Sequence, residues 1–239
     1  MPEVLLSDHP NILLAANRFR RIAFAWAGLS ALVGLITLRM LSGSFPLAAV
    51  PWFICTLLLV SIQQPSGMAL VTVLWGTSLL HLLPGVAALF GPDPLTLMFE
   101  VSTIEKIAFA VVRILLLLMA WNQFMFYRML YGTSYFSGLP KDSPVIPEVI
   151  RNRNDSLARI ALWLGVVSLL AVWGAGLIGV QEMALRLIAF AYICVLLSIG
   201  LGLGAVFSPT NRRRDALSAI GFGFISFLSM LVVARFVIL

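Results

Sequence analysis

The sequence predicts an all-α fold, a polytopic transmembrane helical bundle of about seven spans. Hydrophobic residues make up 61% of the 239 residues and charged residues only 11%, whereas a soluble domain carries about 25% charge. The charges gather between apolar runs, as expected when each charge placed in hydrocarbon costs about 2.5 to 3.5 kcal/mol. The basic residues also sort to one side of these runs, which is typical of chains inserted into a membrane.

Windows of about 20 residues, the length needed to cross a bilayer, define the spans in order. They are predicted at 21–41, 46–62, 68–90, 104–127, 159–180, 184–207 and 217–238. Pro84-Gly85 predicts a kink or a break in the third span. The first span is longer than a signal-peptide core and no small-residue cleavage site follows it, so we expect it to be its own insertion signal.

This division leaves one membrane domain with little chain outside it. The expected parts are a cytoplasmic amphipathic segment 1–20, membrane helices 1–4 over 21–127, a cytoplasmic loop 128–158 and membrane helices 5–7 over 159–239. Within the loop, Pro147 to Arg153 is predicted to form a short interfacial helix. Asp155 or Ser156 is the expected N-cap of the fifth span.

The distribution of Lys and Arg orients the chain. With the N-terminus in the cytoplasm, eleven of these residues lie on the cytoplasmic side and four on the far side, with Arg113 left in the membrane. This bias predicts a plasma-membrane protein with its C-terminus outside. The largest basic cluster, Arg212, Arg213 and Arg214, is expected to set topology and to attract anionic lipid headgroups. No nucleic-acid partner is expected.

A faint internal repeat relates the two halves of the chain. Arg21-Ile22-Ala23 opens the first span and Arg159-Ile160-Ala161 opens the fifth, while Ile54-Cys55 in the second span matches Ile193-Cys194 in the sixth. The pattern predicts a 3+1+3 parallel repeat, in which two groups of three helices are related by an axis along the membrane normal.

At this length, that layout is similar to the hydropathy of the sweet-family sugar carriers, and the similarity implies a small-solute carrier. The similarity does not extend to motifs. The second span ends in Gln63-Gln64-Pro65, which reverses the Pro-Gln turn of that family, and the predicted orientation is opposite to theirs. We therefore do not assign the chain to that family.

The fourth span carries the most unusual polar residues. At 100° per residue, Lys106, Arg113 and Tyr127 fall within about 60° of one another, and Glu105 and Gln123 lie near the two ends of this stripe. A charged side chain inside a predicted span, such as Arg113, is expected to line a pathway, or to contact a partner or a bound anionic group. The structural alternative is an arginine that snorkels or pairs with Glu105, although about 12 Å of helix separates the two. We expect Arg113 to be shielded from lipid.

His81, in the third span, is a candidate cofactor ligand or proton relay, against the structural alternative of a hydrogen bond to a neighbouring helix. The sequence names no cofactor. Cys55 and Cys194 are expected to be small core residues, and no metal site is predicted. The tryptophans fall mostly near span ends, where indoles anchor at the interface. They are Trp26, Trp52, Trp75, Trp121, Trp163 and Trp173.

Small residues at helical spacing predict close helix packing in the last two spans. Gly200 and Gly204 lie four residues apart in the sixth span, and Ala219 and Gly223 repeat this spacing in the seventh. Such pairs let two helix backbones approach closely, either inside the chain or with a partner.

The absence of known catalytic motifs from the sequence limits the functions that we expect. No phosphate-binding, nucleophile-elbow, zinc-protease or paired-cysteine motif is present, and every aspartate falls in a predicted loop or tail. We expect no catalytic residues and no enzyme. The first hypothesis is a non-enzymatic integral membrane subunit that packs with other membrane proteins or cofactors in a larger assembly. The alternative is a small-solute carrier with a pathway near Arg113 and His81.

Seven spans place the two ends of the chain on opposite sides of the membrane. Single cysteines in the 132–144 loop should therefore react only with reagents that reach the cytoplasm, and a cysteine at the C-terminus only from outside. Cysteine-accessibility labelling in intact cells measures both. Labelling of the loop and the C-terminus from the same side would contradict the odd number of spans.

Overall fold

The computed structural model describes residues 10–40, 46–61, 64–84, 93, 102–131 and 148–238, and all regular structure in these ranges is helical. The side chains of residues 10–16, 19, 46, 126–131, 148–150 and 235–238 lie outside this description. The elements are α1 (Pro10–Met40), the 3-10 helix η2 (Pro46–Ala49), α2 (Val50–Val60), α3 (Pro65–Leu80), α5 (Thr103–Tyr131), α7 (Glu148–Leu177), α8 (Gln181–Val206) and α9 (Arg213–Ile238). The predicted all-α class is confirmed for these ranges.

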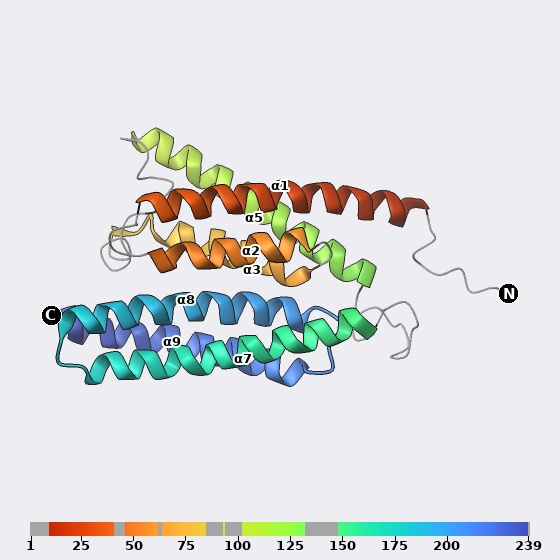
Figure 1. The fold of residues 1–239 in the computed structure, drawn as a ribbon. Coiled ribbons are helices and arrows are strands. Elements are labelled where there is room, and N and C mark those ends of the chain that lie inside the picture. The colour runs from red at the N-terminus through yellow and green to blue at the C-terminus, as the bar shows by residue number, and fades with distance from the viewer. Residues whose placement is uncertain are drawn as a thin grey trace.

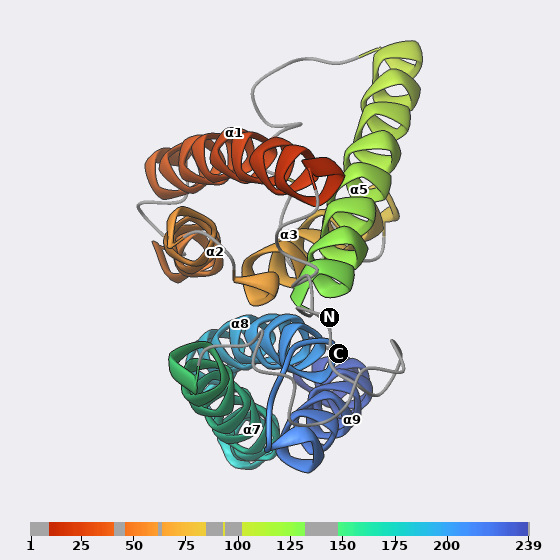
Figure 2. The same cartoon turned by 90° about the vertical axis from the view of Figure 1, so that its right-hand side faces the viewer.

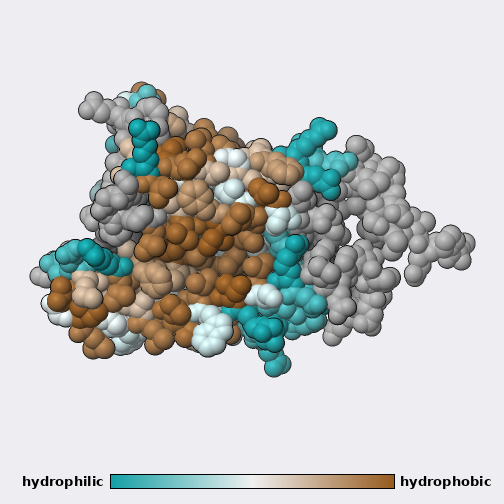
Figure 3. Space-filling view, viewed as in Figure 1, coloured by the Kyte–Doolittle hydropathy of each residue, from teal (hydrophilic) through white to brown (hydrophobic). Residues whose placement is uncertain are grey.

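Four of the helices are long and apolar enough to cross a membrane. They are the segments Arg20–Met40, Arg151–Leu177, Gln181–Val206 and Arg213–Ala234. Two shorter apolar helices cover Leu47–Val60 and Pro65–Leu80. Figure 3 shows a hydrophobic belt across the helices with hydrophilic residues toward both ends. This pattern indicates a membrane protein, while the count of seven spans and the internal repeat stay predictions.

The helices form two groups that meet along α3 and α8. Figure 2 shows α7, α8 and α9 at the corners of a triangle, with α1, α2, α3 and α5 in a second group above it. The contact between the groups runs mainly through α3 and α8. Helix α1 begins and α9 ends at opposite ends of the molecule (Figure 1). Helix α8 is therefore the central element, with 67% of its most apolar stretch buried against 28% for α7 and α9.

The three helices of the α7–α8–α9 bundle meet through small residues at heptad spacing. In each helix the buried residues on one face recur at alternating steps of three and four residues. The exception is the last step on α9, which is four residues where the alternation would give three. These buried residues are Asn154, Ala158, Ala161, Gly165, Ser168, Val172 and Ala175 on α7, Ala184, Ile188, Ala191, Val195, Ser198, Gly202 and Ala205 on α8, and Ala216, Ala219, Gly223, Ser226, Met230 and Ala234 on α9. This spacing is that of left-handed coiled coils, and small side chains bring the helix axes close.

Serine hydroxyls link the helices at the centre of this bundle. The Oγ of Ser198 lies 2.9 Å from the carbonyl oxygens of both Ala161 on α7 and Ala219 on α9. It can donate to one of them at a time. One level away, the hydroxyls of Ser168 and Ser226 lie 2.8 Å apart. Each such bond between helices adds about 0.6 kcal/mol in a membrane, so close packing contributes more than these bonds.

The opposite face of α8 packs against α3 through glycines. A Cβ on Gly200 would lie 2.7 Å from the Cδ1 of Leu70, and a Cβ on Gly204 would overlap the Cα of Ser66 and lie 2.8 Å from its nitrogen. Ala219 and Gly223 belong to the other interface, where a Cβ on Gly223 would lie 2.8 Å from the Cγ1 of Ile199. All four small residues are therefore placed at contacts inside the chain.

Three tryptophans lie in the core rather than at the interface. Trp26, Trp52 and Trp75 are 2%, 8% and 5% exposed. Their rings pack edge to face, with centroids 6.1 Å apart for Trp26 and Trp75 and 5.7 Å apart for Trp52 and Trp75. The prediction that these three anchor at the membrane surface is wrong, because one indole from each of α1, α2 and α3 fills the same interior space. Trp163 and Trp173 are exposed.

Two helices extend beyond the predicted spans, and the expected N-cap of the fifth span is wrong. Helix α1 begins at Pro10, inside the segment expected to precede the first span, and α7 begins at Glu148, so the expected interfacial helix is its first part. Asp155 and Ser156 therefore lie within α7 and cap nothing there. The Asp155 carboxylate instead accepts from the Asn211 N–H at 2.8 Å, and the Asn154 amide donates to the Pro209 carbonyl at 3.0 Å. Asn154 and Asp155 of α7 thus bind the connection between α8 and α9. Cys55 and Cys194 are buried, as expected.

Replacing Gly204 by leucine should destabilise the fold by about 3 kcal/mol or more, at the upper end for overpacked interiors, because the Ser66 backbone cannot move away without shifting α3. Gly221→Leu is the matched control, since a Cβ at Gly221 meets nothing within 4 Å. Thermal unfolding of the detergent-extracted variants measures the difference. Equal midpoints for the two variants would mean that α3 and α8 do not depend on this contact.

Candidate functional site at the end of α3

Helix α3 is apolar but shorter than the four candidate spans. It stops at Leu80, before Pro84, so the predicted break in this span is confirmed. Its 16 residues extend about 24 Å, less than the hydrocarbon thickness of about 30 Å. The last four carbonyl groups of a helix have no partner within it. Where water is absent, each must find another donor.

All four carbonyls at this end have donors. The N–H groups of Leu82 and Leu83 reach the carbonyls of Leu79 and Leu80 at 3.2 and 2.9 Å. The Nδ1 of His81 lies 3.2 Å from the Thr77 carbonyl, where a neutral ring with its proton on Nδ1 donates. The fourth donor, to Ser78, is the guanidinium of Arg113 on α5.

Arg113 is buried and donates to α3. Its side chain is 2% exposed, and its Nη1 lies 3.4 Å from the Ser78 carbonyl. Its position, ten residues after the start of α5, is about 15 Å along that helix. The negative end of a helix dipole favours a cation. Arg113 is thus shielded from its surroundings, as the sequence predicts, and caps the end of a neighbouring helix.

The charge of Arg113 is neutralised by Asp93. The Nη2 of Arg113 forms an ion pair with a carboxylate oxygen of Asp93, which is itself 4% exposed. Asp93 has no regular secondary structure, as expected for a loop residue, but its side chain is buried. Asp93, which lies between α3 and α5 in the sequence, thus pairs with the one buried arginine among the described residues. The Nε of Arg113 has no acceptor within the described part of the chain.

A second contact ties this site to the other group of helices. The Tyr192 side chain of α8 is in hydrogen-bond contact with the Thr77 side chain. The Thr77 hydroxyl donates to the Leu74 carbonyl at 3.0 Å within α3. The end of α3 is therefore bound to α5 through Arg113 and to α8 through Tyr192, and both contacts fall within one turn of helix.

The remaining residues of the predicted polar stripe do not join the site. Glu105 and Lys106 are exposed. The Glu105 carboxylate accepts from the Ser102 N–H at 2.8 Å, and the Glu105 N–H donates to the Ser102 hydroxyl at 3.4 Å. This is a capping box that starts α5, so Glu105 is not the partner of Arg113. Gln123 is half-buried near the other end of α5, and the side chain of Tyr127 is outside the described residues.

The basic cluster at the other end of the molecule is mostly exposed. Arg212 pairs with Asp215 at 3.0 Å, while Arg214 is exposed and Arg213 half-buried. Near this end, the Gln64 side chain lies against the guanidinium of Arg153, and its amide oxygen accepts from that group when the amide is oriented for this network. This contact is a further link between the two groups of helices.

Sequence reasoning found the arginine but missed its partner. Asp93 stands between Pro92 and Pro94, a composition typical of an exposed turn. The available signal was charge balance, because a buried arginine needs an anion and the nearby acidic residues were few. The heptad spacing of small residues in α7, α8 and α9 was also readable in the sequence.

The arrangement is suited to holding helices together. Arg113, Asp93, His81 and the end of α3 satisfy one another, and no group of three or more His, Cys, Asp or Glu side chains within the described ranges is placed to hold a metal ion. The roles of His81 in binding a cofactor and of Arg113 in a pathway stay predictions. Compared with known proteins, the chain matches no family, no curated protein and no solved structure.

Removing one partner of the Arg113–Asp93 pair should destabilise the fold strongly, and removing both charges should destabilise it less. Arg113→Met leaves a buried carboxylate without its cation, which costs about 3–5 kcal/mol. Arg113→Met combined with Asp93→Leu should recover much of this loss. Unfolding midpoints of the extracted proteins measure the coupling.

Arg186→Gln provides the control for this cycle. It removes a pair with Glu182 in which the two side chains are 72% and 76% exposed, and exposed pairs contribute little. Additive effects of the two substitutions at Arg113 and Asp93 would show that the buried pair does not act as a unit.

Proposed function

We propose that the chain is a non-enzymatic integral membrane subunit that packs with other membrane proteins, or with cofactors that they carry, in a larger assembly. The observation that carries this proposal is the exposure of α5. Of its described side chains only Arg113, Ala120 and Phe124 are buried. Its ten exposed large hydrophobic residues are Ile104, Ile107, Phe109, Val111, Val112, Ile114, Leu115, Leu118, Met119 and Trp121.

Helix α5 is attached to the rest of the chain along one side, mainly to α3. Arg113 binds the end of α3, and lower on the helix the ring of Phe124 lies 5.4 Å from that of Phe207. Figure 2 shows one end of α5 projecting beyond α1 and α3. Lipid tails give a helix no hydrophobic reason to pack. Leu116, Leu117 and Ala120 also pack against the core on this side of the helix. The other side, where Asn122 is exposed among apolar residues, is suited to pack against a second protein.

The proposed placement follows the distribution of charge. The chain lies in the plasma membrane with its N-terminus in the cytoplasm and its C-terminus outside, and Arg212, Arg213 and Arg214 meet anionic headgroups on the cytoplasmic side. The support for this placement is the bias of basic residues to one side of the predicted spans.

The experiment is mild detergent extraction of the tagged chain from its native membrane. A subunit migrates with partners at a fixed stoichiometry. Leu115→Ala combined with Leu118→Ala on α5 should lower the recovery of those partners. Leu217→Ala combined with Leu228→Ala on α9 is the matched control, since all four side chains are similarly exposed, and should leave the recovery unchanged. A chain that migrates alone, or partner recovery equal in both variants, would contradict the proposal.

A small-solute carrier is the second candidate function. The observation that favours it is the buried Nε of Arg113, which finds no acceptor among the described residues and can donate to a polar solute. Solute uptake into vesicles containing only this chain, lost in Arg113→Lys while the protein still folds, would support the carrier over the subunit.

A further inference from the structure

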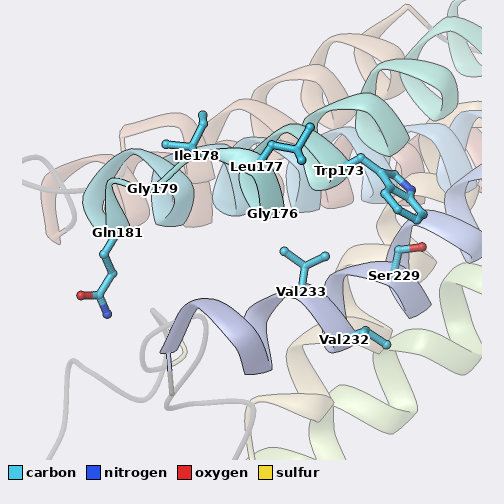
Figure 4. Close-up of a pocket in the computed structure, with 9 residues that line it drawn as sticks. All are labelled: Trp173, Gly176, Leu177, Ile178, Gly179, Gln181, Ser229, Val232 and Val233. Carbon is cyan, nitrogen blue, oxygen red and sulfur yellow. The ribbon is translucent and has the colours of Figure 1, made fainter.

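Two features of the described surface are candidates for a binding site. The first is a groove between α7 and α9, where Trp173, Leu177 and Val232 are among the lining residues (Figure 4). None of the lining residues is charged, so the groove selects no particular occupant. The second is a group of arginines near the start of α1, where the charge does select one.

Three arginines lie within four residues near the start of α1. Arg18, Arg20 and Arg21 are all exposed. Helix α1 contains no aspartate or glutamate, and none of the three arginines forms an ion pair within the described part of the chain. The described residues therefore leave their positive charge without a neutralising partner.

Arg18 and Arg21 share the outward face of α1. At 100° per residue they lie about 60° apart, whereas the buried Ala23, Trp26 and Ser30 lie on the opposite side of the helix. Residues three apart on a helix have Cβ atoms about 5–6 Å apart, so both guanidinium groups reach one anion. Like charges on adjacent turns destabilise a helix, and an anion between them removes that cost.

The two arginines lie at the depth where lipid headgroups are expected. The candidate span of α1 begins at Arg20, and Phe24, three residues after Arg21, is 47% exposed. Figure 3 shows hydrophilic residues on α1 between the hydrophobic belt and the N-terminal end of this helix. Arginine forms paired, charge-assisted hydrogen bonds with phosphate, and the phosphates of a lipid leaflet lie at the edge of its apolar layer.

We infer that Arg18 and Arg21 bind the phosphate of an anionic phospholipid, whose acyl chains lie along Phe24 and the apolar outer face of α1. Two positive charges without an acidic neighbour favour a lipid of net negative charge over a zwitterionic one, whose cationic group meets the same arginines. The site is separate from the basic cluster of α9, where Arg212 is paired with Asp215, since α1 and α9 belong to different groups of helices (Figure 2). It does not involve α5, so it is independent of the proposed assembly.

The test uses the full chain reconstituted in vesicles of phosphatidylcholine and phosphatidylglycerol, doped with one of the two lipids carrying a diazirine in its acyl chain. Peptide mass spectrometry then locates the cross-links. The phosphatidylglycerol probe should label residues 21–32 more strongly than the phosphatidylcholine probe does, while both should label the groove segments 173–181 and 229–233 equally. Each arginine near a membrane surface adds about fivefold to the affinity for anionic lipid. Arg18→Gln combined with Arg21→Gln should therefore abolish most of the preference at α1.

Lys106→Gln combined with Arg186→Gln is the matched control. It removes the same total charge from exposed side chains, but Lys106 follows Glu105 in the sequence and Arg186 is paired with Glu182. Both residues lie near the starts of α5 and α8, which begin at the opposite end of the molecule from α1 (Figure 1). This control should leave the labelling of α1 unchanged.

A measurement on the parent protein protects the test from misfolding of the variants. Salt screens exposed charges, so the preference for phosphatidylglycerol at α1 should fall as the salt concentration is raised. Equal labelling of α1 by the two probes, or a preference that survives the loss of both arginines, would overturn the site. A preference abolished by an excess of inorganic phosphate at constant ionic strength would assign the arginines to a soluble anion and overturn the lipid site. Cross-linking of a photoreactive amino acid at Asn17 to a protein in native membranes would overturn it as well.

Discussion

The absence of water is the constraint on which the rest of this structure depends. A helix that ends within the apolar part of a membrane protein leaves four carbonyl groups without partners. At the end of α3 two are satisfied by a local turn, one by His81 and one by Arg113. Arg113 is acceptable there only because Asp93 neutralises it. The break in α3, the ion pair and the contact between α3 and α5 therefore depend on one another.

Helix α8 shows how the remaining helices associate without a hydrophobic driving force. Both of its faces contain small residues, but the residues are spaced differently and make different contacts on the two faces. The face toward α7 and α9 repeats every seven residues and includes Ser198, which reaches carbonyls on both neighbours. The face toward α3 has Gly200 and Gly204 in direct contact with backbone. Close van der Waals contact stabilises both interfaces.

The helices of the molecule differ in how much of their surface is covered by other helices. The α7–α8–α9 bundle and α3 approach one another at backbone distance, as Gly204 against Ser66 illustrates. Helix α5 packs along one side, where Arg113, Ala120 and Phe124 are buried, and exposes most of its other described side chains. Under the proposed function, the exposed side of α5 is the surface that a partner protein would contact.

The sequence by itself determined the class of protein, the approximate helices and several of the residues that matter. Hydropathy and helical spacing are local properties, so they identified the long apolar helices, the shielded Arg113, the break before Pro84 and the packing glycines. Contacts between distant segments were decided only by the tertiary structure. Asp93 and Asp155 read as loop and cap residues, and Trp26, Trp52 and Trp75 as surface anchors, because no local pattern records which helix face meets which neighbour. The rotation of α1, α2 and α3 about their axes, set by packing against one another, turned the three tryptophans inward. Contacts between segments distant in the sequence paired Asp93 with Arg113 and Asp155 with Asn211.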